Sequence, residues 1–252
     1  MSSGSKLNLL LGLSIEGIEQ HIASLPKDAV EQCNDAIPKD AQGAPKFPIN
    51  SEDNGYTNQF HIAKASEVDG LAVCERLQKQ GSPHVGEATV FVSWFLKTPL
   101  TTLVDALREF LRQKQLPLDT KFWVCDFVIR QATRQLTAAD NDVKRLGDCV
   151  RAVGHTVLLL EPWHAPAPLQ RAYCIKEVYH TQASGAQFDV VMSSAQQAAF
   201  DTALVDDFDS IQASLSKVDV RTAKCMKPED TKAILDELKQ GVGLVECNTL
   251  VI

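Results

Sequence analysis

Tyr173 and Glu177 are the residues of this chain whose types and spacing most clearly could do chemistry. They lie four positions apart, so a helix would place the ring and the carboxylate on one face. The apolar run 155–160 precedes them and reads as a buried strand of a parallel sheet, because it is short, unbroken and soon followed by Pro162. Open α/β sheets bind ligands beyond the carboxyl ends of their strands. The pattern therefore predicts a carboxylate at a ligand-binding sheet edge.

Strands and helices alternate through most of residues 88–200, and this order predicts how the carboxylate is positioned. The alternation is typical of a doubly wound, parallel α/β sheet. The predicted strands are residues 89–93, 121–126, 155–160 and 188–193, and the predicted helices include residues 100–111, 142–153 and the segment that carries Glu177. Gly154 is a good stop signal for the helix before it.

Two segments resemble the Toll/interleukin-1 receptor (TIR) domain family. Tyr173-Cys174-Ile175-Lys176-Glu177 follows the aromatic-Cys-x-x-Glu pattern that opens the helix after the fourth TIR strand, and Thr89-Val90-Phe91-Val92-Ser93 resembles the first TIR strand. Residues 85–93 are closest to TIR-like proteins of algae and other microbial eukaryotes, which read Val-Gly-x-Ala-Thr-x-Phe-Val-Ser. The resemblance implies a flavodoxin-like fold, with five parallel strands and helices on both faces, and places a long signalling loop at residues 130–140.

The resemblance also implies a function for Glu177. In the TIR domains that cleave NAD+ in signalling, the Glu of this pattern is the catalytic residue. NAD+ would be the substrate and would be cleaved to nicotinamide and ADP-ribose or a cyclic form, with no cofactor or metal required. The transition state resembles an oxocarbenium ion, which a carboxylate near the ribose stabilises. The expected substrate-binding residues are Ser93, Trp94, Trp163 and Tyr173.

One departure from the algal pattern favours a second interpretation. Trp94-Phe95-Leu96 stands where those relatives have His-Ala-Trp, so an imidazole is missing. A chain without turnover would be a TIR-like module that self-associates or binds another protein. A third hypothesis is a Cys174 nucleophile with His164 or His180 as its base.

Each candidate residue also has a structural interpretation. Glu177 can be a surface acid, and Tyr173 can belong to the core. Trp163 can seal the edge of the sheet, and Ser93 can simply end its strand.

Composition limits the partners and the compartment. A chain of 252 residues with 44% hydrophobic content can bury one large core, so one main domain is expected. The net charge of -7, with Lys and Arg scattered among acids, predicts no nucleic-acid partner. Seven cysteines without a Cys-x-x-Cys pair indicate neither a zinc site nor a disulfide framework, and fit the reducing cytoplasm. No apolar run is long enough to predict a membrane span.

The two ends of the chain complete the predicted organisation. Residues 1–84 are expected to precede the TIR-like domain of residues 85–252, with a helix over 13–25, a Pro-rich extended arm over 26–60 and a helix over 65–80. The expected C-terminal elements are helices over residues 195–204, 208–215 and 228–239, and an edge strand or docked tail over 244–251.

Overall fold

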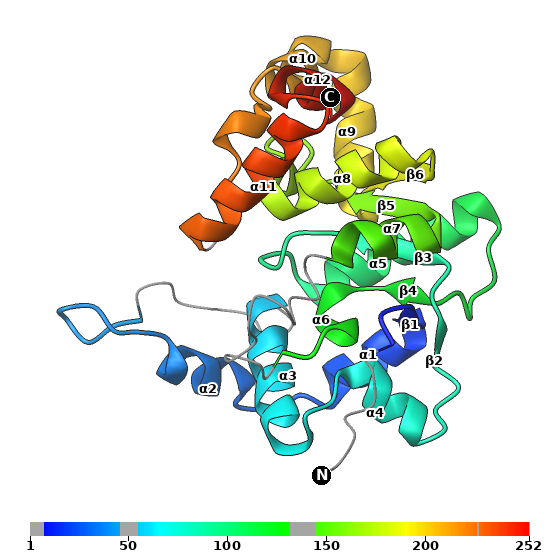
Figure 1. Ribbon diagram of the computed structural model, residues 1–252, viewed down its shortest axis with the longest axis vertical. Helices are drawn as coiled ribbons and strands as arrows, with labels where there is room; N and C mark the ends of the chain where they lie inside the picture. The colour runs from blue at the N-terminus through cyan, green and yellow to red at the C-terminus, as the bar shows by residue number, and fades with distance from the viewer. Residues whose placement is uncertain (1–7, 46–54, 132–144, 226, 252) are drawn as a thin grey trace. The chain divides into compact units, whose positions relative to one another are not determined.

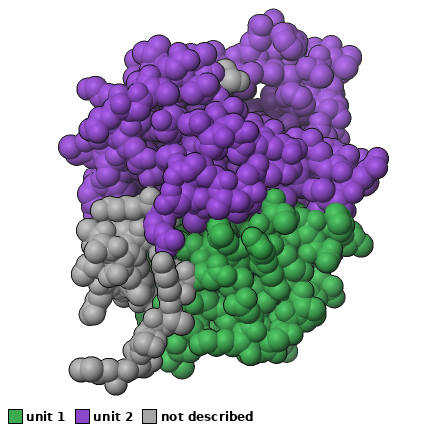
Figure 2. Space-filling view, turned by 45° about the vertical axis from the view of Figure 1, so that its right-hand side comes forward, with its two compact units in different colours: residues 1–89, 96–104, 117–143 green, residues 90–95, 105–116, 144–252 purple. Residues whose placement is uncertain are grey.

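The computed structural model describes residues 8–45, 55–131, 145–225 and 227–251 (Figure 1). The chain forms two compact units, shown in separate colours in Figure 2. Unit 1 comprises residues 1–89, 96–104 and 117–143, and unit 2 comprises residues 90–95, 105–116 and 144–252. Both units combine helices with strands, which confirms the α/β class. The expected division into an N-terminal arm of residues 1–84 and a TIR-like domain of residues 85–252 stays a prediction.

An antiparallel sheet organises unit 1. Strand β1 (Leu11–Leu13) pairs antiparallel with β2 (Val85–Glu87) and with β4 (Phe122–Trp123). All three residues of β1 are buried, and the Trp123 indole donates a hydrogen bond to the Leu9 carbonyl at 2.8 Å. Successive strand residues point to opposite faces, so their common burial means that both faces of β1 are covered.

The helices of unit 1 differ from the predicted ones in where they break. The helix predicted over residues 65–80 is divided at Gly70, whose φ of 68° is in the left-handed region that favours glycine. Residues 26–60, expected to be an extended arm, include one complete helix and the start of another, while residues 46–54 lie outside the described part. The helices are α1 (Ile15–Ala23), α2 (Ala29–Ala36), α3 (Gly55–Asp69), α4 (Val73–Lys79) and α6 (Cys125–Val128).

A parallel sheet organises unit 2. Its strands β3 (Val90–Ser93), β5 (His155–Leu159) and β6 (Gln187–Val191) pair in that order. They confirm the strands predicted in these places. The strand pairing of the chain is nevertheless mixed, because β1 pairs antiparallel in unit 1, so the wholly parallel five-stranded sheet is not what the described residues form. The difference arises from the N-terminal residues, which contribute a strand that the predicted sheet did not include.

The helices of unit 2 largely follow their predicted positions. Gly154 ends α7 with a φ of 74°, as expected of its stop signal. The predicted start of that helix at residue 142 and most of the predicted loop over 130–140 lie outside the described residues. The helices are α7 (Leu146–Val153), α8 (Ala172–Ser184), α9 (Ser194–Asp206), α10 (Phe208–Leu215), α11 (Pro228–Gln240) and α12 (Leu244–Val251), while α5 (Leu100–Lys114) has residues in both units.

Helix α8 is the central helix of unit 2. In Figure 1 it lies between the strands and α11. Its residue Val178 packs with Leu158 of β5, whereas Ile175 packs with Leu238 of α11. The last element, α12, is a helix and not an edge strand. It docks through its buried Cys247 on the cluster formed by α8 and α11, which agrees with the docked tail that was the other expectation. Burial on both sides makes α8 a rigid support for the side chains it carries.

None of the helices in the described ranges is long and apolar enough to cross a membrane.

Candidate functional site

The structure brings Ser93 and Glu177 together inside unit 2. Ser93 is the last residue of β3, and Glu177 lies in the second turn of α8. The Ser93 hydroxyl donates a hydrogen bond to Oε2 of Glu177. Ser93 is fully buried and Glu177 is 8% exposed. The pair therefore lies at the carboxyl end of a parallel strand, where the sequence pattern placed a carboxylate.

Burial dominates the electrostatics of this pair. The loss of solvation raises the pKa of Glu177 to about 8, although the Ser93 hydrogen bond and the charge of Lys176 act in the opposite direction. Glu177 therefore carries a proton at neutral pH in the free protein. A group of this kind can hold or release a proton near neutral pH, which is a common property of functional carboxyls.

Trp94 and Cys174 form a second contact beside this pair. The Cys174 thiol donates to the backbone carbonyl of Trp94, with 3.4 Å between sulfur and oxygen. Burial raises the pKa of the Cys174 thiol well above its usual range. Cys174 thus has the environment of a packed cysteine rather than of a thiolate nucleophile. The buried indole nitrogen of Trp94 has no hydrogen-bond partner among the residues that the structure describes.

The other two predicted substrate-binding residues, Tyr173 and Trp163, contact other parts of unit 2 than the Ser93–Glu177 pair does. Tyr173 packs against the cluster formed by α8, α11 and α12, and burial raises the pKa of its hydroxyl. The Trp163 backbone N–H donates to the Gln196 side chain at 3.1 Å, and its ring makes an edge contact with Phe200. Tyr173 and Glu177 are four residues apart, yet Glu177 contacts β3 while Tyr173 contacts the C-terminal helices.

A polar cluster on α8 was not anticipated. Glu237 of α11 accepts a hydrogen bond from the Lys176 ammonium at 2.7 Å and lies 2.9 Å from the His180 ring nitrogen. Burial lowers the pKa of His180 despite this carboxylate. Gly147 makes room for the ring, since a Cβ there would lie 2.8 Å from it. The sequence predicted the start of α11 from Pro228. It could not predict that Glu237 would pair with Lys176 and His180, because these residues lie some 60 positions earlier in the chain.

Comparison of the chain with protein-family models, with curated proteins and with solved structures found no match. The TIR-like assignment therefore rests on the residue pattern and stays a prediction. Among the described residues, no group of three His, Cys, Asp or Glu side chains is placed to hold a metal ion. The Ser93–Glu177 pair is the part of the predicted site that the structure assembles.

Proposed function

We propose that this chain is a TIR-like NAD+ glycohydrolase in which Glu177 is the catalytic residue. The observation that supports the proposal best is the contact between Glu177 and Ser93 at the carboxyl end of β3. The proposal treats the parallel strands β3, β5 and β6 as the part of a flavodoxin-like sheet that carries the site. Products would be nicotinamide and ADP-ribose or its cyclic form.

In this mechanism Glu177 acts as an anion. When the bond between nicotinamide and ribose breaks, its electron pair leaves with nicotinamide and positive charge develops on the ribose, where a nearby carboxylate stabilises it. Water then adds to the same carbon to give ADP-ribose, or a nucleophilic group of the same molecule adds to give the cyclic form. The nicotinamide ring of NAD+ is itself cationic, so binding of the substrate would favour ionisation of Glu177. Ser93 would hold the carboxylate in place through its hydrogen bond. Nicotinamide is a good leaving group, so the step requires no general acid.

The direct test is incubation of concentrated protein with NAD+ while the release of nicotinamide is followed from pH 6 to pH 10. Because the ionised form of Glu177 is the active one, kcat/KM should rise with pH and level off above a midpoint near the pKa of about 8. Absence of release at every pH, from protein shown to be folded, would contradict the proposal.

Ser93→Ala is expected to move that midpoint to higher pH. The Ser93 hydroxyl lowers the pKa of Glu177 by stabilising its ionised form, so the variant should need a more alkaline solution to become active. Ser194→Ala is a suitable control, because Ser194 donates hydrogen bonds to the Asp105 carboxylate and none to Glu177. A midpoint that stays at the wild-type value would show that Ser93 does not tune Glu177.

The alternative function is a TIR-like interaction module without turnover. The observation that favours it is an apolar surface at the junction of α9 and α10, where Leu204, Val205 and Phe208 are exposed. Exposed apolar side chains that lie close together commonly mark contacts with other proteins. This function becomes the better proposal if folded protein at high concentration releases no nicotinamide.

A further inference from the structure

A pocket lies within unit 1, and none of its lining residues belongs to the Ser93–Glu177 site. It has a volume of about 290 Å³ and lies between α1, α4 and the segment that leads into β2. This volume is near the lower end of the range for small-molecule sites. Its lining includes the apolar side chains Val73 and Leu77 and the polar side chains of Arg76 and Ser82. Its walls can thus contact both an apolar and a polar part of one molecule.

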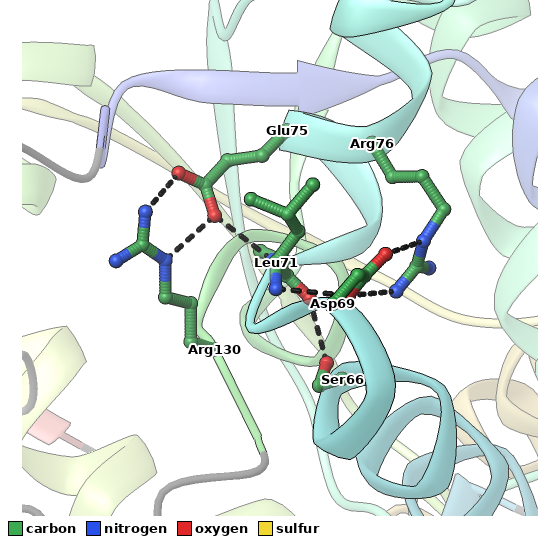
Figure 3. Close-up of polar contacts among 7 residues, drawn as sticks. Ser66, Asp69, Leu71, Glu75, Arg76 and Arg130 are labelled. Carbon is green, nitrogen blue, oxygen red and sulfur yellow. Dashed lines mark hydrogen bonds and ion pairs between the residues drawn. The ribbon is translucent and has the colours of Figure 1, made fainter. Parts of the chain in front are cut away.

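Arg76 supplies the positive charge of this pocket. As Figure 3 shows, its guanidinium faces Asp69, and its Nε and Nη2 donate to the two carboxylate oxygens at 2.6 and 2.9 Å. Its Nη1 makes no hydrogen bond to the residues that the structure describes. Asp69 is fixed in turn, because it accepts the Leu71 N–H at 3.0 Å. One edge of the guanidinium is therefore held in place while other N–H groups can bind a ligand.

Two histidines complete the polar wall without adding a competing anion. Gln20 lies 2.9 Å from Nε2 of His84, whose Nδ1 is 3.3 Å from the Ser14 hydroxyl. His21 contacts Asn58 at 2.5 Å, and burial lowers the pKa of its ring, which favours the neutral form. The pocket lining contains no Asp or Glu. Glu16 comes within 3.8 Å of His84 but is 71% exposed, so water screens much of its charge.

We propose that this pocket binds the oxyanion group of a small molecule, either a phosphate or a carboxylate, through Arg76. The Ser82 hydroxyl oxygen accepts a hydrogen bond from the backbone N–H of His84 at 3.3 Å, which leaves the hydroxyl hydrogen to donate to the anion. The remainder of the ligand is small and partly apolar, and it packs on Val73 and Leu77.

Calorimetric titration of the full chain with inorganic phosphate, phenyl phosphate and benzoate tests this site. Phenyl phosphate should bind more tightly than inorganic phosphate, because its ring gains contact with the apolar wall. If phenyl phosphate binds more tightly than benzoate, the natural group is a phosphate, and the reverse order indicates a carboxylate. No measurable binding of any of the three probes at millimolar concentration would overturn the proposal.

Three variants locate the binding at Arg76. Arg76→Gln should weaken phenyl phosphate binding at least about tenfold, since a charge-assisted contact is lost. Asp69→Asn should strengthen it by about threefold, because the guanidinium loses its competing anion, and loss of folding could not produce such a gain. Lys79→Gln is the matched control, because Lys79 is an exposed cation of the same helix outside the pocket lining. Equal weakening by Arg76→Gln and Lys79→Gln would overturn the proposal.

Discussion

Glu177→Gln is expected to lower the rate of nicotinamide release from NAD+ by about a thousandfold. The amide keeps the size of the side chain and a hydrogen bond with Ser93, but it cannot supply the negative charge that the developing oxocarbenium ion needs. The measurement is kcat/KM at pH 9, where Glu177 of the wild type is ionised. Glu229→Gln is the control, because Glu229 is an exposed glutamate on α11 of the same unit.

The same variant should be more stable than the wild type at alkaline pH, which separates lost chemistry from lost folding. The pKa of Glu177 rises from an ordinary 4.5 to about 8 on folding, so the folded protein binds the proton more tightly than the unfolded chain. The free energy of unfolding of the wild type therefore falls as the pH rises from about 4.5 through about 8. The total loss is at most roughly 1.4 kcal/mol for each unit by which the pKa of the folded state exceeds that of the unfolded state. Glu177→Gln lacks this loss. Unchanged nicotinamide release by a folded Glu177→Gln protein would remove Glu177 from the mechanism.

The strands and helices of unit 2 could be predicted because their signals are local. The apolar run that becomes β5 is unbroken and buried, and Gly154 stops α7 where the sequence indicates. The strands of unit 1 were predicted less well. A strand was expected over residues 121–126, but β4 covers only Phe122–Trp123 and the chain turns into helix α6 at Cys125, and β1 was not predicted at all. β1 has three residues and β4 has two, so neither is long enough to show the alternation of apolar and polar residues that marks a strand. Both strands also pair with residues far away in the sequence.

The candidate site was predictable only in part, for a related reason. The sequence pattern placed Ser93 at the end of a strand and Glu177 on the helix that follows the fourth strand, and the structure brings the two side chains together. Helical spacing also suggested that Tyr173 shares the surroundings of Glu177. That inference assumes a helix with one buried face, whereas α8 is covered by the strands on one side and by α11 and α12 on another. On such a helix, positions one turn apart can contact different elements.

Asp126→Asn is expected to stabilise the protein by a few kcal/mol at pH 8, because it removes a buried charge. Asp126 is in α6 of unit 1 and is fully buried. The Cys125 thiol and the backbone N–H of Asp126 itself lower the pKa of this carboxyl, but they do not compensate for its loss of solvation. Burial raises its pKa to about 7, from an ordinary value of 3.8. The wild type should therefore lose stability as the pH rises from about 4 through about 7, as its folded form resists ionisation.

Urea unfolding at pH 4 and pH 8 measures this effect. At pH 4 the folded wild type keeps its Asp126 proton, so the variant should gain little there, and the gain should appear at pH 8. Asp119→Asn provides the control, since Asp119 is an exposed aspartate of the same unit and its replacement should change stability little at either pH. A variant that is less stable than the wild type at pH 8 would mean that the Asp126 carboxylate is held by a favourable partner. Asp126 would then be a second candidate functional acid, because proteins that keep a buried carboxylate ionised commonly use its charge.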